Sequence, residues 1–234
     1  MFRKAVILAG GLGHRLKPFT EVIPKPLLPI GESSVLEIQI DSLRKYGIRD
    51  IYIATNYKSA FIEAFLGDGS KYGVSIKYSR EEKPLGTCGP ITLLADMLNE
   101  PFILMNGDIL TTLNFGDLYD FFRQVESPLT VVSTEIVTPF QFGKIISDGD
   151  YIGGIQEKPD IKFEILAGIY VFQPELLSMI PFDSFFGMDD LIRLLLGKNI
   201  KIAKYKMKDY WLDIGRLNDY ETAQSAYNDH FKGR

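Results

Sequence analysis

The sequence predicts a single α/β domain over residues 1–234, with helices on both faces of a mixed, mostly parallel central sheet. Three observations lead to this three-layer fold class. Strand-like and helix-like segments alternate along the chain. No glycine- or proline-rich linker divides it. A chain of 234 residues with 46% hydrophobic content is long enough to bury one full core.

The predicted strands are short and mostly apolar or β-branched, as buried strands are. In chain order they span 5–8, 50–54, 75–78, 102–105, 130–133, 165–171 and 200–206. The predicted helices lie between them and span 35–46, 58–66, 89–98, 115–126, 174–179, 189–198 and 217–231. The last helix is amphipathic but polar, so we expect it on the surface rather than in a membrane.

A glycine-rich turn follows the first predicted strand, the apolar run KAVILA at 4–9. Glycines in such a turn adopt positive φ and let backbone N–H groups approach an anion without a Cβ in the way. The glycines of this turn are Gly10, Gly11 and Gly13. The turn therefore predicts a phosphate-binding loop.

Two cations follow the turn and strengthen the phosphate interpretation. Arg15 offers a forked guanidinium that can grip two phosphate oxygens, and Lys25 offers a compact point charge. Pro24 and Pro26 stiffen the backbone on either side of Lys25. Together the loop and the cations indicate a site for a nucleoside triphosphate.

Two better-known glycine motifs do not fit this segment. A P-loop ends in Gly-Lys-Ser/Thr, whereas His14 follows Gly13 here. A dinucleotide fingerprint needs a third glycine where this chain has Leu16.

Further motifs are distributed along the chain in a fixed order. After LAGGLGHRLKPFTEVIPKPLLPI at 8–30 come NYKSAFIEAFLGDGSKYGVSIKYSREEKPLGTCGP at 56–90, NGD at 106–108, EKP at 157–159, AGIYVF at 167–172 and WLDIGRLNDY at 211–220. This ordered set resembles the sugar-1-phosphate nucleotidylyltransferases, also called NDP-sugar pyrophosphorylases. The resemblance implies a Rossmann-like (GT-A-like) nucleotidyltransferase domain. Several relatives add a C-terminal β-helix of hexapeptide repeats, which we do not expect in these 234 residues.

The resemblance also implies roles for individual residues. Catalysis would rest on Arg15 and Lys25. The nucleotide would be bound by Leu8, Ala9, Gly10, Gly11, Gly13, Arg15, Lys25, Leu85, Gly86 and Thr87. The sugar phosphate would be bound by Gly143, Glu157, Lys158 and Gly168. Mg²⁺ would be bound by Asp108 and Asp213.

The metal assignment depends on combining two distant aspartates. Asp108 follows the apolar strand FILM, and a carboxylate at the carboxyl end of a parallel strand is well placed for a hard cation. An isolated NGD is more typical of a turn or helix cap. Asp213 favours the metal role of Asp108 over a cap, because the resemblance implies that the family's second metal-binding carboxylate is at position 213. Mg²⁺ usually combines one or two carboxylates with substrate phosphates and keeps several waters.

The sequence departs from the family pattern at two positions. Leu166 stands where many members have an asparagine that reaches the sugar, and an apolar side chain cannot replace that hydrogen bond. His14 stands where a small threonine is commoner; contact with the nucleotide and a plain surface position both remain open.

Composition and charge limit the function classes. A net charge of −4 argues against a general nucleic-acid binder. Cys88 is the only cysteine, which favours a reducing, cytoplasmic setting. A packing role is expected for it, since a nucleophilic cysteine needs a nearby base.

No signal peptide and no apolar run of about 20 residues is evident, so we expect no membrane association. A homo-oligomer is compatible with the chain; the aromatic group Phe182, Phe185 and Phe186 is a candidate partner surface, although core packing is more usual.

The predicted reaction is transfer of a nucleoside monophosphate to a sugar 1-phosphate, with release of pyrophosphate and formation of an NDP-sugar for glycan or polysaccharide synthesis. The forms PKPLLPI and EEKPLGTCGP most resemble those of mannose-1-phosphate and heptose-phosphate guanylyltransferases, so GTP and a mannose- or heptose-type sugar are favoured. UTP and CTP remain open, because base choice can depend on one or two hydrogen bonds. A noncatalytic nucleotide-sugar sensor is a further alternative; a related glycosyltransferase would carry Asp-x-Asp instead of NGD.

Overall fold

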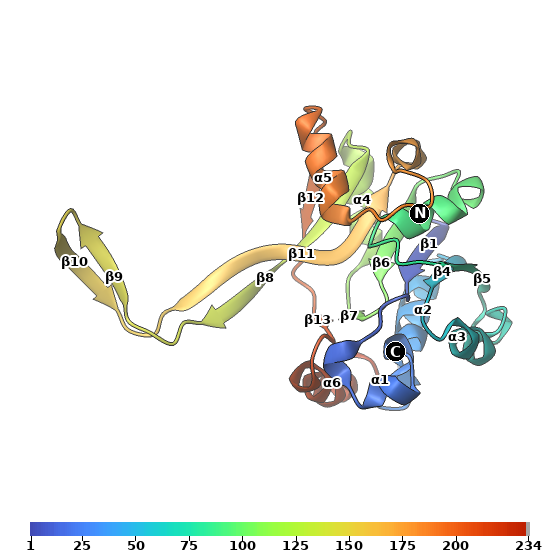
Figure 1. Ribbon diagram of the computed structural model, residues 1–234, viewed down its shortest axis with the longest axis horizontal. Helices are drawn as coiled ribbons and strands as arrows, with labels where there is room; N and C mark the ends of the chain where they lie inside the picture. The colour runs from blue at the N-terminus through green and yellow to red at the C-terminus, as the bar shows by residue number, and fades with distance from the viewer. Residues whose placement is uncertain (233–234) are drawn as a thin grey trace.

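The computed structural model describes residues 1–232 and is built on a seven-stranded sheet, shown in Figure 1. The strand order across the sheet is β12-β8-β11-β6-β1-β4-β5. The strands span β1 Lys4–Leu8, β4 Asp50–Thr55, β5 Ser75–Arg80, β6 Phe102–Asn106, β8 Leu129–Pro139, β11 Asp160–Phe172 and β12 Ala203–Lys206.

Strand directions confirm the predicted mixed, mostly parallel sheet. β6, β1, β4 and β5 run parallel to one another, and β12 runs parallel to β8. β11 is antiparallel to both of its neighbours, β6 and β8. The parallel strands therefore bring their carboxyl ends to one edge of the sheet, where α/β folds place their ligands.

Alternate residues of each central strand pack into two separate cores, one on each face. Ile7, Ile53 and Met105 face the core under α2 Val35–Lys45, α3 Ser59–Leu66 and α4 Phe115–Gln124. Val6 and Leu104 face the opposite core, under η4 Gly89–Met97, η5 Pro174–Met179 and α5 Met188–Gly197. This arrangement gives the predicted three layers.

Helix starts and helix types follow local sequence. α2 begins at a capping box, in which the Ser34 hydroxyl accepts from the Glu37 N–H and the Glu37 carboxylate accepts from the Ser34 N–H. The segments predicted as helices at 89–98 and 174–179 are 3-10 helices, each with proline at its first turn. In η4 the Thr92 hydroxyl also donates to the Gly89 carbonyl.

Short elements complete the body. They are η1 His14–Leu16, α1 Phe19–Val22, η2 Lys25–Leu27, β2 Pro29–Ile30, β3 Ser33–Ser34, η3 Ser70–Tyr72, β7 Ile109–Thr111, β13 Trp211–Asp213 and α6 Leu217–His230. The final helix packs on the loop through Leu16, Ile30 and Ala223. In residues 1–232 no β-helix is present, and no helix is long and apolar enough to cross a membrane.

A two-stranded ribbon extends from the body where β8 and β11 continue past the sheet, and Figure 1 shows it ending in a hairpin. The hairpin consists of β9 Lys144–Asp148 and β10 Tyr151–Gln156. We call residues 134–166 the arm. Because Ile169 of β11 lies opposite Met105 near the end of β6, the arm leaves the body at the edge that holds the carboxyl ends of the parallel strands. The sequence did not predict the arm, since the strands expected at 130–133 and 165–171 leave residues 134–164 without a predicted strand.

Candidate active site

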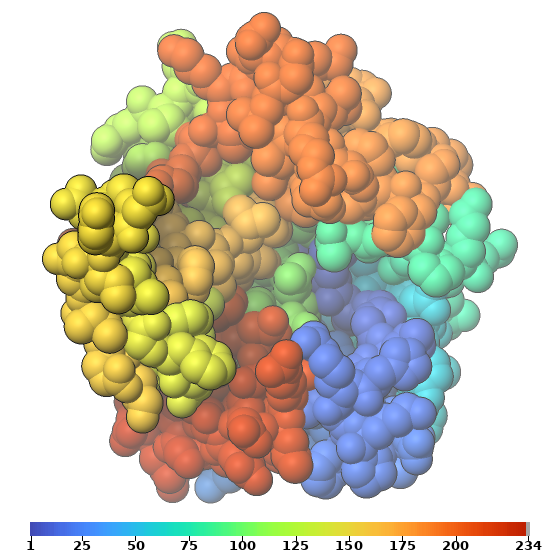
Figure 2. Space-filling model, turned by 60° about the vertical axis from the view of Figure 1, so that its left-hand side comes forward, coloured from blue at the N-terminus to red at the C-terminus, as the bar shows by residue number. Residues whose placement is uncertain are grey.

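An open cavity of about 510 Å³ lies at the carboxyl ends of β1 and β6. It is lined by Leu8, Gly10, Gly11, Leu12, Gly13, His14, Asn56, Glu81, Pro84, Leu85, Gly86, Thr87, Pro90, Asn106, Asp108 and Phe185. Figure 2 shows a hollow in this face of the molecule, bordered by N-terminal residues in blue and C-terminal residues in orange and red. The glycine turn, the segment 84–87 and Asp108, which are far apart in the sequence, therefore share one cavity.

Backbone geometry explains why the glycine turn requires glycine at position 13. Gly13 has φ +63°, and a Cβ there would lie 2.7 Å from Thr20 Cγ2. The Thr20 hydroxyl donates to the Gly13 carbonyl at 2.9 Å and holds the turn against α1. Gly11 differs, because a Cβ there would meet no atom within 4 Å. The turn thus has a fixed end at Gly13 and an open part at Gly11 that faces the cavity.

A second tight turn forms the opposite wall. Gly86 has φ +81°, and a Cβ there would lie 2.7 Å from the Phe186 carbonyl oxygen. The N–H groups of Cys88 and Gly89 both donate to that oxygen, at 2.9 and 3.0 Å. The wall is therefore held directly against the loop before α5.

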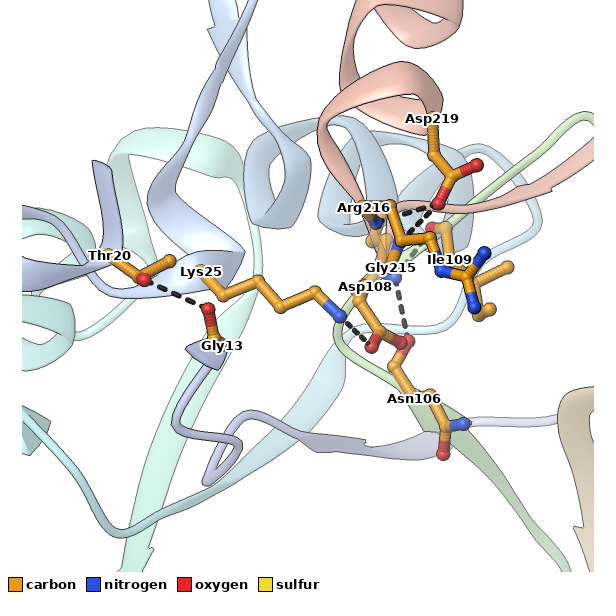
Figure 3. Close-up of polar contacts among 10 residues, drawn as sticks. Gly13, Thr20, Lys25, Asn106, Asp108, Ile109, Gly215, Arg216 and Asp219 are labelled. Carbon is orange, nitrogen blue, oxygen red and sulfur yellow. Dashed lines mark hydrogen bonds and ion pairs between the residues drawn. The ribbon is translucent and has the colours of Figure 1, made fainter. Parts of the chain in front are cut away.

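A buried ion pair lies beside the glycine turn, as Figure 3 shows. Lys25 is only 9% exposed, and its Nζ donates to Asp108 Oδ2 at 2.5 Å. An ammonium removed from water needs such a counter-charge. The proline-flanked segment predicted to hold Lys25 forms η2, which directs this side chain toward the end of β6.

Asp213 joins this pair from the other end of the chain. β13 pairs antiparallel with β7, and the Ile214 N–H donates to the Asp108 carbonyl at 3.0 Å. Burial raises the pKa of Asp213, and the negative charge of Asp108 raises it further, while Lys25 and Arg15 act in the opposite direction. Each aspartate keeps one buried oxygen, Oδ1, without a hydrogen-bond partner among the described residues. Two neighbouring carboxylates with unpartnered oxygens fit a hard divalent cation.

Arg15 is exposed and reaches the same group of charges. Its Nη2 lies 3.4 Å from the position that a Cβ on Gly215 would occupy, so glycine at 215 leaves room for the guanidinium. Asp219 accepts from the N–H groups of Gly215 and Arg216, at 3.1 and 2.7 Å, and fixes the turn after β13 (Figure 3).

The residues predicted for the sugar phosphate do not gather in the cavity. Gly143, Glu157 and Lys158 lie in the arm, where a Cβ on Gly143 would be 3.2 Å from Glu157 Oε2. Gly168 lies at the base of the arm with φ +70°, and a Cβ there would be 2.7 Å from Asn106 Nδ2. Leu166 lines a separate groove beside α5. The arm residues therefore form their own group, apart from the glycine turn.

Other predicted positions have local structural roles. Ala9 is buried and its N–H donates to the Ala54 carbonyl at 2.8 Å, so this N–H is already paired. His14 lines the cavity. Cys88 is fully buried, and burial raises the pKa of its thiol to about 12, as expected for a packing residue. Phe185 lines the cavity and is 69% exposed, whereas Phe186 packs partly into the core.

Several cavity residues were not predicted from the sequence: Leu12, Asn56, Glu81, Pro84, Pro90, Asn106 and Phe185. Glu81 is the most informative of them, because burial raises the pKa of its carboxyl and Oε2 accepts from the Leu85 N–H at 3.0 Å. A half-buried carboxylate on a cavity wall is a candidate recognition group. Its position within EEKP, three residues before Pro84, was the available signal.

The base of the arm is connected by a side-chain hydrogen bond to β13, the strand that carries Asp213. Trp211, the first residue of β13, donates from Nε1 to the Ala167 carbonyl at 2.8 Å. Asp213 is two residues further along the same strand. This hydrogen bond therefore joins the base of the arm to the strand that carries Asp213.

The chain matches the nucleotidyl transferase family over residues 4–230. It is 32% identical over 232 residues to the mannose-1-phosphate guanylyltransferase catalytic subunit beta of Danio rerio, and 31% identical over 233 residues to the mannose-1-phosphate guanyltransferase of Saccharomyces cerevisiae. Each match covers 96% of this chain and 64% of the relative, so the chain spans a little under two thirds of their length.

Solved structures share the fold. A putative glucose-1-phosphate thymidylyltransferase from Bacillus anthracis, in complex with a sucrose, superposes with a TM-score of 0.81 at 26% identity, covering 99% of this chain and 97% of that one. HddC from Yersinia pseudotuberculosis, complexed with GMP-PN, superposes with a TM-score of 0.75 at 25% identity, covering 97% of this chain and 100% of that one. With a match that spans nearly the whole sequence, this chain belongs to the nucleotidyl transferase family.

Proposed function

We propose that this chain transfers a nucleoside monophosphate from a nucleoside triphosphate to a sugar 1-phosphate and releases pyrophosphate. The observation that carries the proposal is the group of Lys25, Asp108 and Asp213 beside the glycine turn. It combines a buried cation for phosphate with two carboxylates for a metal, at the edge of the sheet where α/β folds bind ligands. The names of the sequence relatives support the same reaction.

The proposal includes Mg²⁺ held by Asp108 and Asp213. Their unpartnered Oδ1 atoms are the observation that supports a cation at this position. Mg²⁺ would neutralise negative charge on the phosphate oxygens.

The roles of the protein's own residues follow from charge and position. Backbone N–H groups of the open glycine turn and the Arg15 guanidinium would bind the β- and γ-phosphates, which leave as pyrophosphate. Lys25 would stabilise charge at the α-phosphoryl group, moving its Nζ from Asp108 to the phosphate oxygens. The attacking phosphate oxygen is already an anion, so the chain needs no general base. Catalysis then rests on positioning and on charge stabilisation.

We infer that GTP is the preferred nucleotide, with Glu81 as the base-reading group. The guanine Watson–Crick edge presents two adjacent donors, N1–H and N2–H, and a carboxylate accepts both. Uracil presents one donor between two carbonyl oxygens, which a carboxylate repels. Glu81 lines the same cavity as Gly86 and Thr87, so its carboxylate is placed to meet a base bound against that wall. UTP and CTP remain the competing choices.

The sugar is proposed to be of mannose or heptose type and to be bound by the arm together with Gly168. Glu157 accepts hydroxyl hydrogen bonds and Lys158 pairs with the sugar phosphate once the arm bends toward the cavity. Pairing between β8 and β11 is irregular between Leu166 and Tyr170, so the arm has a defined point for such bending.

A cytoplasmic location is part of the proposal and is supported by the unpaired Cys88.

The test is pyrophosphate release with Mg²⁺ across GTP, UTP, CTP, ATP and dTTP against a panel of aldose 1-phosphates. We expect release with GTP and a mannose- or heptose-type 1-phosphate, abolition by EDTA, and recovery when Mg²⁺ is added back. Binding of a nucleotide sugar without release from any pair would favour the sensor and would contradict the proposal.

A further inference from the structure

The arm carries an unusual share of the exposed apolar side chains. Of the 21 large hydrophobic side chains that are exposed in residues 1–232, ten lie in the arm, which is 33 residues long. They are Val137, Phe140, Phe142, Ile145, Ile146, Tyr151, Ile152, Ile155, Phe163 and Leu166. Several are mostly exposed, such as Tyr151 at 81% and Ile152 at 70%. This concentration needs a physical explanation, because isolated exposed apolar residues are normal but a dense group is not.

The exposed area of these side chains is large enough for a protein interface. Summed over the ten side chains, which lie on both faces of the arm, it is on the order of 900 Å². A specific interface buries about 800 Å² on each partner. An isolated two-stranded ribbon is also only marginally stable in water. The arm therefore fits a surface that is covered by another protein chain.

The strand edges of the hairpin indicate how that chain binds. β9 and β10 form a separate two-stranded sheet, so the outer edge of each has no strand partner in residues 1–232. β10 contains a bulge between Ile152 and Gly154, which disrupts an edge. β9 is regular and fully exposed. The outer edge of β9 is thus the better template for strand addition.

The charges on β9 make it complementary to itself. If two copies of β9 pair antiparallel about a two-fold axis at Ile146, Lys144 of each copy lies opposite Asp148 of the other, because the two residues are equally distant from Ile146. Opposite charges placed directly across a sheet stabilise the pairing. A two-fold interface repeats this contact twice.

We propose that two copies of this chain form a homodimer through the arm, with β9 of one copy pairing antiparallel with β9 of the other. The two hairpins then form one four-stranded sheet. Ile145 and Ile155 lie opposite each other across β9 and β10 and share a face with Ile152, so the dimer brings the isoleucines of both copies onto one face. This interface is distinct from the cavity and does not depend on the proposed reaction.

The test reverses the charges on β9 and measures the oligomeric state by sedimentation velocity. The wild-type chain should sediment as a dimer at tens of micromolar, twice the mass of the 26.5 kDa chain. Lys144→Glu and Asp148→Lys should each weaken the dimer about tenfold or more, since each places like charges opposite each other at two positions. The double variant Lys144→Glu/Asp148→Lys should restore wild-type dimerisation. Both residues are exposed, so the fold should be unaffected, as circular dichroism would verify.

Lys77→Glu is the matched control, because Lys77 is an exposed lysine on an edge strand, β5, outside the arm. It should sediment as the wild type does. Hydrogen exchange supplies an independent measurement, in which the amides of 144–148 become protected as protein concentration rises. A monomeric wild-type chain, or a dimer that responds equally to the single and double variants, would overturn the proposal. Sedimentation and hydrogen exchange do not need turnover. Failure of the dimer proposal is therefore distinguishable from failure of the proposed reaction.

Discussion

At the scale of single residues, Lys25 differs clearly from Lys17, the other lysine of the N-terminal loop. It is 9% exposed and paired with Asp108, whereas Lys17 extends from the surface and contacts Glu21 at 3.2 Å. A buried ammonium held by one counter-charge is already oriented before a ligand arrives. The removal of Lys25 should therefore affect chemistry rather than surface properties.

We expect Lys25→Ala to lower kcat for pyrophosphate release by two to three orders of magnitude, which corresponds to about 3–4 kcal/mol of transition-state stabilisation. Lys17→Ala should retain kcat near the wild-type value, because its side chain is exposed and paired only at the surface. Steady-state kinetics with both variants, after circular dichroism has verified their folds, measures the difference. A Lys25→Ala enzyme within threefold of wild type would contradict the catalytic role.

A second residue-scale prediction concerns the nucleobase. Glu81→Gln should lower kcat/KM for GTP by about ten- to a hundredfold, because the amide accepts only one of the two guanine hydrogen bonds. The Leu85 N–H keeps an acceptor, since the glutamine oxygen can replace Glu81 Oε2. The efficiency with UTP should fall less, so the GTP/UTP ratio is the measured quantity. Glu82→Gln, an exposed neighbour outside the cavity, is the control and should leave the ratio unchanged.

At the scale of elements, the glycine turn and the arm behave in opposite ways. The turn is held by the Thr20 hydroxyl and by close packing around Gly13. The arm continues from the body through β8 and β11, ion pairs from Lys204 to Glu164 and from Lys206 to Glu135 tie its base to β12, and most of its side chains are exposed. The stability of the glycine turn should therefore be sensitive to small changes in side-chain size. The binding role of the arm should instead be sensitive to changes in its polar side chains.

The stability of the turn is tested by Gly13→Ala. A Cβ in the left-handed region costs about 1–2 kcal/mol, and the contact at 2.7 Å from Thr20 Cγ2 adds to it, so we expect a loss of about 2 kcal/mol. For a chain of this size the melting temperature should fall by about 5 °C. Gly11→Ala is the matched control, since nothing lies within 4 Å of its Cβ position, and its melting temperature should stay within about 1 °C of wild type. Equal shifts in the two variants would be inconsistent with the packing described for Gly13.

The role of the arm in sugar binding is tested by Glu157→Gln. We expect KM for the sugar 1-phosphate to rise about tenfold, because an amide accepts fewer hydroxyl hydrogen bonds than a carboxylate. KM for the nucleotide should not change, since Glu157 lies outside the cavity. Asp150→Asn, in the turn between β9 and β10 of the same arm, should leave both constants unchanged. Equal changes in the two KM values would argue for a general effect on the fold.

At the scale of the whole molecule, the sheet brings together residues that local sequence cannot relate. The parallel strands were predictable because buried strands such as 5–8 and 102–105 are continuously apolar, and the structure confirms them as β1 and β6. The arm was not predictable, because its strands are exposed and continue the sheet with mixed polar and apolar residues that give no core pattern. The glycine turn was predictable, because glycines close together directly after an apolar strand indicate a backbone that other residues do not readily adopt. Glu81 and Phe185 reach the same cavity only through long-range packing, so the EEKP segment alone did not identify Glu81 as a cavity residue.

Trp211 gives the molecule a built-in optical reporter, because it is the single tryptophan of the chain. Its indole is half-buried and bonded to the base of the arm, two residues from Asp213. Indole emission depends on local polarity and hydrogen bonding. The intrinsic fluorescence of the protein therefore reports changes around the hydrogen bond between Trp211 and Ala167, without labelling. We expect a spectral change when Mg²⁺ and GTP are added and a second change when the sugar 1-phosphate follows. Stopped-flow fluorescence would then give the order and rates of the two binding events directly from the unmodified protein.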